Sequence, residues 1–148
     1  MTVKICLVMS IPFSPPFGRT ACEVPLLCEN GFDVTIVGVG DRTLPRQENL
    51  EGVHIFRVRN DSIYSSPFGT IFNPLTLLSV FIKALRQKAD VYHCYNYAMV
   101  PVAFALKLWG KRVIYDIGDD DPSNYSYVMR KHFHLGPIAV LVEKVFRF

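Results

Sequence analysis

The segment from residue 90 to residue 122, which reads DVYHCYNYAMVPVAFALKLWGKRVIYDIGDDDP, constrains the fold of this chain more than any other part of it. Two short apolar runs rich in β-branched and aromatic residues, 90–94 and 112–117, enclose an apolar segment of helical length that ends at Gly110. This order predicts a strand, a helix and a second strand. Because a hairpin cannot hold so long a connection, the two strands should lie parallel, joined by a right-handed crossover.

The carboxyl ends of parallel strands share one edge of a sheet, and open parallel sheets bind their ligands at that edge. Tyr95, Asn96 and Tyr97 would follow the first of these two strands, and residues 118–121 (GDDD) would follow the second. Polar and aromatic residues therefore gather where a binding site is expected.

Three further strands are predicted upstream of this unit. Residues 3–9 (VKICLVM) are nearly all apolar, as in a central strand that is covered on both faces. Residues 33–39 form the second strand, 40–49 a polar loop, and the alternation in 53–58 suits a less buried strand at the sheet edge. The fold class predicted is α/β, a Rossmann-like parallel sheet of five strands in the order 3-2-1-4-5, with helices on both faces.

Three helices outside the opening unit have recognisable ends. One is predicted to run from Thr20, which has capping-box spacing to Glu23, as far as the stop at Asn30-Gly31. The next begins at Asn73-Pro74 and carries one apolar stripe, made by Leu77, Leu78, Phe81, Ile82 and Leu85. The last begins at Gly136-Pro137, and the chain stops on its apolar end. We therefore expect one domain, residues 1–148, cut at its C-terminal end from a larger protein, with an incompletely covered apolar face on the last helix.

Composition and charge indicate which classes of partner the chain can bind. The longest uncharged apolar run, 98–106, is too short to span a bilayer. The net charge of +3 is modest and no basic run exceeds two residues, so no nucleic-acid partner is expected. A preference for anionic ligands or lipid surfaces stays open, and with it a peripheral contact with the inner face of a membrane.

The four cysteines also bear on the compartment. Cys6, Cys22, Cys28 and Cys94 form no CxxC pair and each lies in an apolar segment. Buried free thiols are therefore expected in preference to disulfides or a metal site, which indicates the reducing environment of the cytoplasm.

Six segments together carry a family resemblance. They are PPFG (15–18), NGFDVTIV (30–37), EGVHIFRV (51–58), ADVYHCYN (89–96), KLWGKR (107–112) and VIYDIGDD (113–120). Their order and spacing resemble the N-terminal, acceptor-side half of the retaining glycosyltransferases of family 4, which have the two-domain GT-B fold. No single motif among them is diagnostic.

The resemblance implies a set of substrate-binding residues in the loop after the first strand. In the family this loop has a proline pair followed by two glycines and lies against the acceptor and the donor diphosphate. Here Gly18 matches the first glycine, and Arg19 stands in place of the second. The guanidinium of Arg19 would clamp a phosphate or would pair with a neighbouring acid, and both interpretations stay open. Tyr95 and Asn96 are further candidates, from the edge position of their loop.

After the fifth strand the family has tyrosine, aspartate, any residue, histidine and an acid. This chain has Tyr115, Asp116, Ile117, Gly118 and Asp119, so Gly118 replaces the histidine that contacts the transferred sugar. The resemblance gives Asp119 the catalytic acidic position, in contact with a sugar or acceptor hydroxyl, and makes Asp116 and Gly118 substrate-binding.

Two other residue sets invite a catalytic or metal interpretation. His93 lies in a strand expected to be buried, where a hydrogen-bonded core histidine is commoner than a catalyst. The acids at 119–121 suit a hard cation, but a solvated turn or helix cap before Pro122 explains them as well, and GT-B enzymes resemble one another in needing no bound metal. Neither a metal nor a cofactor is expected.

The function implied is that of a cytoplasmic hexosyltransferase of polysaccharide biosynthesis. It would move a sugar from a nucleotide-diphosphate donor to a glycan or lipid-linked acceptor. Because GT-B enzymes hold the donor mainly through their C-terminal domain, the chain alone should lack transfer activity. The alternative is a non-catalytic Rossmann-like binding or scaffold module, consistent with Arg19 and Gly118. A dinucleotide oxidoreductase is disfavoured because no GxGxxG follows the first strand.

Overall fold

The computed structural model describes residues 2–10, 20–40, 43–60 and 73–116. The chain divides into two compact units, Met1–Asp116 and Ile117–Phe148, and every described residue belongs to the first. The expectations for the acids at 119–121 and for the last helix therefore lie outside the described residues.

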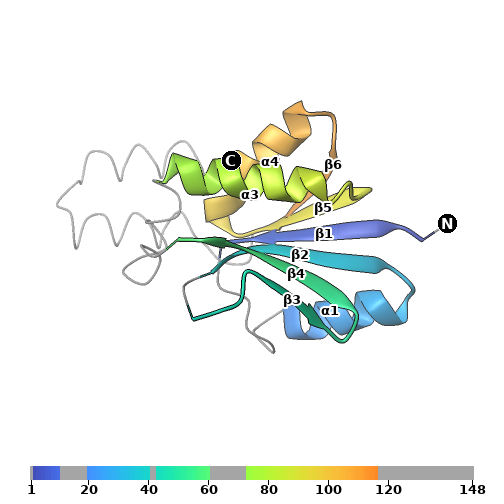
Figure 1. The fold of residues 1–148 in the computed structure, drawn as a ribbon. Coiled ribbons are helices and arrows are strands. Elements are labelled where there is room, and N and C mark those ends of the chain that lie inside the picture. The colour runs from blue at the N-terminus through green and yellow to red at the C-terminus, as the bar shows by residue number, and fades with distance from the viewer. Residues whose placement is uncertain (1, 11–19, 41–42, 61–72, 117–148) are drawn as a thin grey trace, which may run out of the picture. The chain divides into compact units, whose positions relative to one another are not determined.

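The described part of the chain is built on one six-stranded sheet (Figure 1). Its strands are β1 (Lys4–Met9), β2 (Asp33–Gly40), β3 (Gln47–Leu50), β4 (Val53–Arg59), β5 (Val91–Tyr95) and β6 (Arg112–Asp116). They lie in the order β3-β4-β2-β1-β5-β6. Every neighbouring pair is parallel except β3 with β4. The predicted order of the five parallel strands is confirmed.

The predictions for the edge next to β4 are wrong in two respects. Residues Gln47–Leu50 form an antiparallel strand instead of part of a loop, so β4 is not the edge strand. Glu51 and Gly52 make a two-residue turn in which φ is +50° and +88°. Such turns match the twist of a hairpin. The polar sequence QENL gives no strand pattern, and this strand depends on backbone pairing with β4.

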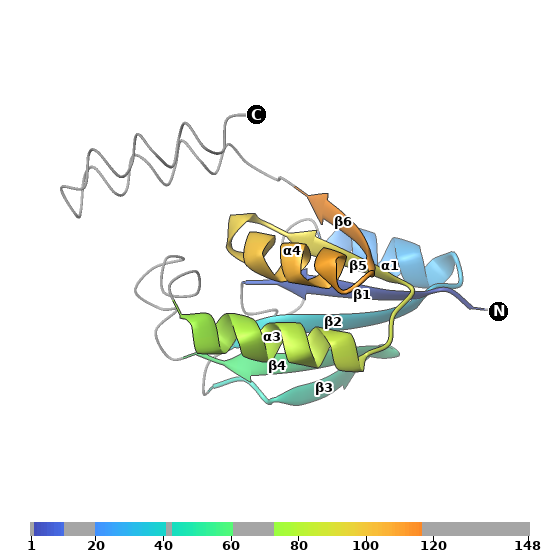
Figure 2. The same ribbon diagram turned by 90° about the horizontal axis from the view of Figure 1, so that it is seen from above.

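Helices cover both faces of the sheet (Figures 1 and 2). Helix α1 (Thr20–Glu29) lies on one face; α3 (Pro74–Arg86), the short 3-10 helix η2 (Tyr97–Met99) and α4 (Val100–Leu108) lie on the other. Two apolar clusters fill the layers. Cys6 and Val8 of β1 face α3 and α4, whereas Leu7 and Met9 face α1. β1 is thus the buried central strand that its composition predicted.

Three of the predicted helix ends are confirmed, namely the start of α3 and the ends of α1 and α4. The side chain of Asn73 caps α3 by accepting a bond from the Thr76 N–H at 3.2 Å. Helix α1 ends before Gly31, whose φ is +82°, and the Phe32 N–H donates to the Leu27 carbonyl at 3.1 Å. Gly110 follows α4 in the same way, with φ at +74°. Both glycines satisfy the carbonyls that a helix end leaves unpaired.

The apolar stripe predicted for α3 is wrong in part. The helix buries Val80 and Ala84, with Leu77, Phe81 and Leu85 partly buried beside them. Leu78 and Ile82, in contrast, are exposed. None of the helices in the described ranges is long and apolar enough to cross a membrane.

An ion pair between a buried arginine and a partly exposed glutamate holds the β3–β4 hairpin at the edge of the sheet. The Arg57 side chain is 2% exposed, and its Nη2 donates to Glu48 Oε2 at 2.6 Å. Its Nη1 donates to the Pro45 carbonyl at 3.0 Å. A Cβ added at Gly40 would lie 2.9 Å from Arg57 Cδ, so the absence of a side chain there makes room for the arginine. The pair fastens β3, and the residues before it, to β4.

We expect Glu48→Ala to lower the free energy of unfolding by about 1–3 kcal/mol, because the buried Arg57 guanidinium loses the Glu48 carboxylate. The measurement is urea denaturation. The control is Glu29→Ala, which removes an exposed carboxylate and should change stability little. An equal effect of the two substitutions would contradict a stabilising role for the buried pair.

All four cysteines are free, but only two fit the expectation of burial. Cys6 and Cys94 are buried, Cys28 is half-buried, and Cys22 is exposed, against the prediction. Burial raises the pKa of Cys94 to about 12, and burial together with the neighbouring Cys94 raises the pKa of Cys6. The native state therefore keeps thiol protons that an unfolded chain releases near its ordinary thiol pKa of 9.0.

This difference predicts that stability falls as pH rises. The contribution of the protonated Cys94 thiol is complete below the unfolded pKa of 9.0 and is lost progressively up to about 12. Urea denaturation at about pH 8 and about pH 10 should show a fall of about 1 kcal/mol for each buried thiol. The fall should be smaller in Cys94→Ala; the same fall in both proteins would exclude this thiol as its cause.

Candidate functional site

The strand order reverses between β1 and β5, which places the ligand-binding crevice of such a sheet at their carboxyl ends. Ser10 directly follows β1 and Asn96 directly follows β5. The Ser10 hydroxyl, in a residue only 7% exposed, donates to Asn96 Oδ1 at 2.8 Å. A side-chain hydrogen bond thus bridges the two strand ends at the switch point.

Asn96 has an unusual backbone conformation, with φ at +59° and ψ at 166°. Its N–H donates to the Asp116 carbonyl at 3.3 Å, and its own carbonyl accepts from the Met99 N–H at 3.1 Å. These bonds hold it between the end of β6 and the start of η2. Strained backbone of this kind concentrates at functional sites, because the surrounding structure must maintain it.

The described residues bring three of the sequence-predicted site residues together. Tyr95 and Asp116 are register partners at the ends of β5 and β6. Asn96 accepts a hydrogen bond from Ser10 after β1 and donates one to Asp116 at the end of β6. All three are half-buried. Gly18, Arg19, Gly118 and Asp119, the other predicted members, lie outside the described residues.

A second polar cluster lies on the α1 side of the same strand. His93 and Tyr95 both point toward α1, and their rings stack with 4.2 Å between centroids and 30° between planes. Glu23 of α1 meets both: its Oε1 lies 3.0 Å from His93 Nδ1, and its Oε2 accepts a hydrogen bond from the Tyr95 hydroxyl. The His93 and Glu23 side chains are 15% and 23% exposed, so the cluster reaches the surface.

Neither Glu23 nor His93 was placed in a binding site by the sequence analysis. Glu23 was expected only in a capping box. His93 is hydrogen-bonded as expected, but it lies partly exposed rather than deep in the core. The spacing of His93 and Tyr95 could have indicated a shared face, since side chains two apart on a strand point the same way. Nothing local identified Glu23 as their partner.

The cluster has a defined hydrogen-bonding capacity. A neutral imidazole that donates from Nδ1 to Glu23 carries its acceptor lone pair on Nε2. Hydroxyl groups, such as those of a sugar, donate to acceptors of this kind. Within the described ranges, no group of three or more His, Cys, Asp or Glu residues could hold a metal ion.

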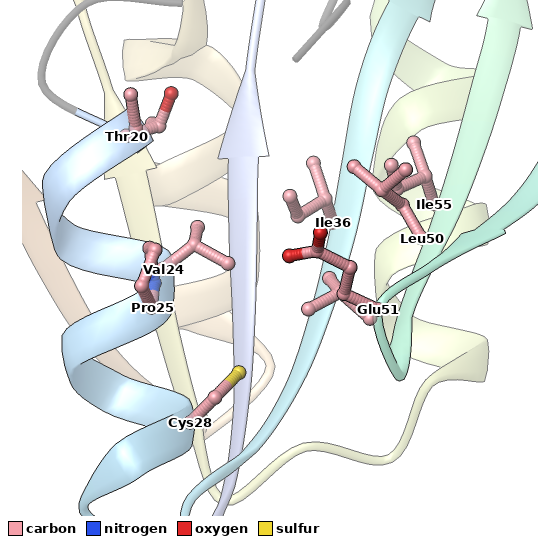
Figure 3. A pocket seen from close by; sticks show the side chains of 10 residues that line it. Thr20, Val24, Pro25, Cys28, Ile36, Leu50, Glu51 and Ile55 are labelled. Carbon is pink, nitrogen blue, oxygen red and sulfur yellow. The ribbon is translucent and has the colours of Figure 1, made fainter. Parts of the chain in front are cut away.

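An apolar hollow of about 370 Å³ lies between α1 on one side and strands β2, β3 and β4 on the other (Figure 3). Its lining residues are Thr20, Ala21, Val24, Pro25, Cys28, Ile36, Leu50, Glu51, Val53 and Ile55. Figure 3 shows Val24 and Cys28 on α1 across the hollow from Ile36. Of the candidate site residues that the structure describes, Tyr95, Asn96 and Asp116 do not line it, and its described wall offers few polar groups to fix a sugar.

Comparison with protein-family models gave no match, and neither did comparison with curated proteins. The solved structures that share the fold include the following two. One is sucrose-phosphate synthase from Thermosynechococcus elongatus, with a TM-score of 0.58 and 13% identity over 96% of this chain and 39% of that chain. The other is described as "Trehalose-6-phosphate from E. coli bound with UDP-2-fluoro glucose", with a TM-score of 0.50 and 14% identity over 75% of this chain and 32% of that chain.

Both neighbours are GT-B glycosyltransferases, so the fold of this chain is that of a Rossmann-like GT-B domain. The chain spans 32% and 39% of the lengths of the two structures. At 13% and 14% identity the likeness shows the fold alone, and it does not extend to family 4 in particular.

The conformation of Asn96 gives a testable prediction. Asn96→Ala loses the bond from Ser10 and also puts a non-glycine, non-asparagine residue at positive φ, whereas Asn96→Gly loses only the bond. We expect Asn96→Gly to be the more stable variant by about 1 kcal/mol in urea denaturation. If the alanine variant is as stable as the glycine variant, the backbone at this position is not strained.

Proposed function

We propose that residues 1–148 are the acceptor-side domain, similar to family 4, of a GT-B glycosyltransferase. The reaction would move a hexosyl group from a nucleotide-diphosphate sugar to a hydroxyl of a glycan or lipid-linked acceptor. The observation that carries this proposal is the meeting of Ser10, Asn96 and Asp116 at the carboxyl edge beside the switch point. One neighbour in fold is described as bound with UDP-2-fluoro glucose, which supports a nucleotide sugar as the donor.

The proposed roles follow the edge of the sheet. Asn96 and Asp116 would bind sugar or acceptor hydroxyls, and Tyr95, which Glu23 holds by its hydroxyl, would present its ring beside them. Gly18 and Arg19 would approach the donor diphosphate, with the Arg19 guanidinium as its clamp. Gly118 would line the substrate, and Asp119 would contact a reacting hydroxyl. A second domain would supply most donor contacts, so this chain alone would not transfer sugar.

The alternative is a binding or scaffold module without catalysis, for which Arg19 and Gly118 remain the sequence arguments. The two functions differ in one measurable property. An enzyme releases nucleoside diphosphate from a nucleotide sugar in the presence of acceptor, whereas a binding module does not. UDP-glucose is the first donor to assay, within a panel of nucleotide sugars.

In the complete protein, Arg19→Ala and Asp119→Ala should each lower the transfer rate by an order of magnitude or more. This corresponds to roughly 1–3 kcal/mol for a polar partner left unsatisfied. The thermal midpoint should hardly change, because we propose that both side chains serve the substrate and not the fold. The measurement is transfer rate alongside thermal midpoint.

Arg112→Ala is the matched control, since Arg112 is exposed at the start of β6, away from the carboxyl edge, and its loss should leave transfer unchanged. Normal rates in both the Arg19 and Asp119 variants would remove these residues from the mechanism. A fall in midpoint that parallels the fall in rate would make them structural.

A further inference from the structure

Helix α3 presents an apolar face to solvent as well as to the core. Leu75, Leu78 and Ile82 are exposed, from 40% at Ile82 to 73% at Leu75. Their spacing of three and four residues places them on one side of the helix, opposite the buried side that carries Val80 and Ala84. A surface helix normally carries polar residues on its outer side, so this one requires an explanation.

Helix α4 also exposes apolar side chains. Phe104, Leu108 and the adjoining Trp109 are 64–73% exposed. The two helices lie side by side over one face of the sheet (Figure 2) and pack against each other. The rings of Phe81 and Trp109 meet edge to face at 6.0 Å, which joins the end of α4 to the middle of α3. We call the six residues Leu75, Leu78, Ile82, Phe104, Leu108 and Trp109 the α3–α4 face.

The charges carried by these two helices have one sign. Helices α3 and α4 contain no acidic residue, whereas Lys83, Arg86 and Lys107 lie within them. Arg86 follows Ile82 by four residues and is exposed, so it continues the apolar row, and Lys107 is exposed beside Leu108. A surface that is apolar and cationic complements one that is apolar and anionic.

We propose that the α3–α4 face binds the surface of an anionic lipid bilayer, with both helices lying in the interface. Helix α3, 13 residues long, would lie along the surface for about 20 Å. Exposed leucine, phenylalanine and tryptophan beside lysine and arginine are the composition of helices that bind in this way. A tryptophan is also suited to the boundary between lipid headgroups and acyl chains.

A second copy of the chain is the weaker occupant. A two-fold interface brings the same patch of each copy together. Arg86 and Lys107 of one copy would then approach the same cations of the other, without an acid on either helix to pair with them. Anionic lipid headgroups meet no such repulsion. This inference concerns the helical layer and is independent of the sugar-transfer proposal, which concerns the sheet edge.

Trp109 makes the proposal directly measurable, because it is the single tryptophan of the chain. The full chain is mixed with vesicles of phosphatidylcholine alone, and with vesicles in which about a third of the lipid is phosphatidylglycerol. We expect the Trp109 emission to shift to shorter wavelength with the anionic vesicles only. Added NaCl should reverse the shift, because salt screens attraction between surface charges.

Paired substitutions test which surface binds. Leu78→Gln combined with Phe104→Gln should weaken vesicle binding by about tenfold or more, since two side chains no longer enter the interface. Leu26→Gln is the control, because Leu26 is also exposed, at 59%, but lies on α1 across the sheet. Arg86→Glu combined with Lys107→Glu should likewise abolish the preference for anionic vesicles, and Arg59→Glu, at an exposed position on β4, should not.

All these positions are exposed, so thermal midpoints should stay close to that of the unsubstituted chain. The proposal is overturned if Trp109 emission does not shift or if the shift is equal with neutral vesicles. It is overturned as well if the double variant, Leu78→Gln with Phe104→Gln, binds as well as Leu26→Gln. It is also overturned if gel filtration shows a dimer that this double variant dissociates while vesicles are not bound. The α3–α4 face would then be a contact between copies.

Discussion

The parallel pairing of β1 with β5 is the contact on which the described structure depends. It joins residues near the start of the chain to residues 86 positions later, with Cys6 opposite Tyr92 and Val8 opposite Cys94. All four of these side chains are fully buried. At the amino end of the pair the Lys4 N–H donates to Asp90 Oδ2 at 2.8 Å, and at the carboxyl end Ser10 donates to Asn96. Burial and terminal hydrogen bonds therefore hold the same register, and a shift by one residue would reverse every side chain.

That register also separates the two surfaces to which roles are proposed. Successive side chains of β5 point to opposite faces, so His93 and Tyr95 meet Glu23 on the α1 side. Tyr92 and Cys94 meet the core beneath α3 and α4. The sheet edge collects polar groups, while the outer side of α3 and α4 carries exposed apolar and basic residues. A common fold can carry both features, because each is set by side chains that the sheet itself does not need.

Much of the fold followed from sequence patterns. The nearly all-apolar β1, the strand, helix and strand unit around Gly110, and the glycine stops all predicted elements that the structure contains. The strand Gln47–Leu50 did not follow, because its residues have little strand preference and its pairing partner lies across a two-residue turn. Its stability comes from backbone bonds and from the ion pair between Glu48 and Arg57. The pattern of polar and apolar residues along the sequence predicts neither the backbone pairing nor the ion pair.

By itself the sequence determined the parallel sheet, the order of its five parallel strands and the position of Tyr95 and Asn96 at the carboxyl edge. These depend on periodicity, chain length and handedness, which are properties of short segments. Only the tertiary structure decided that Glu23 meets His93 and Tyr95, that Ser10 reaches Asn96, and that Leu78 and Ile82 face outward although their spacing matched the core stripe. Helical periodicity tells which residues share a side of a helix. Which side is buried, and which distant side chain lies opposite, depends on how the helix packs on the sheet.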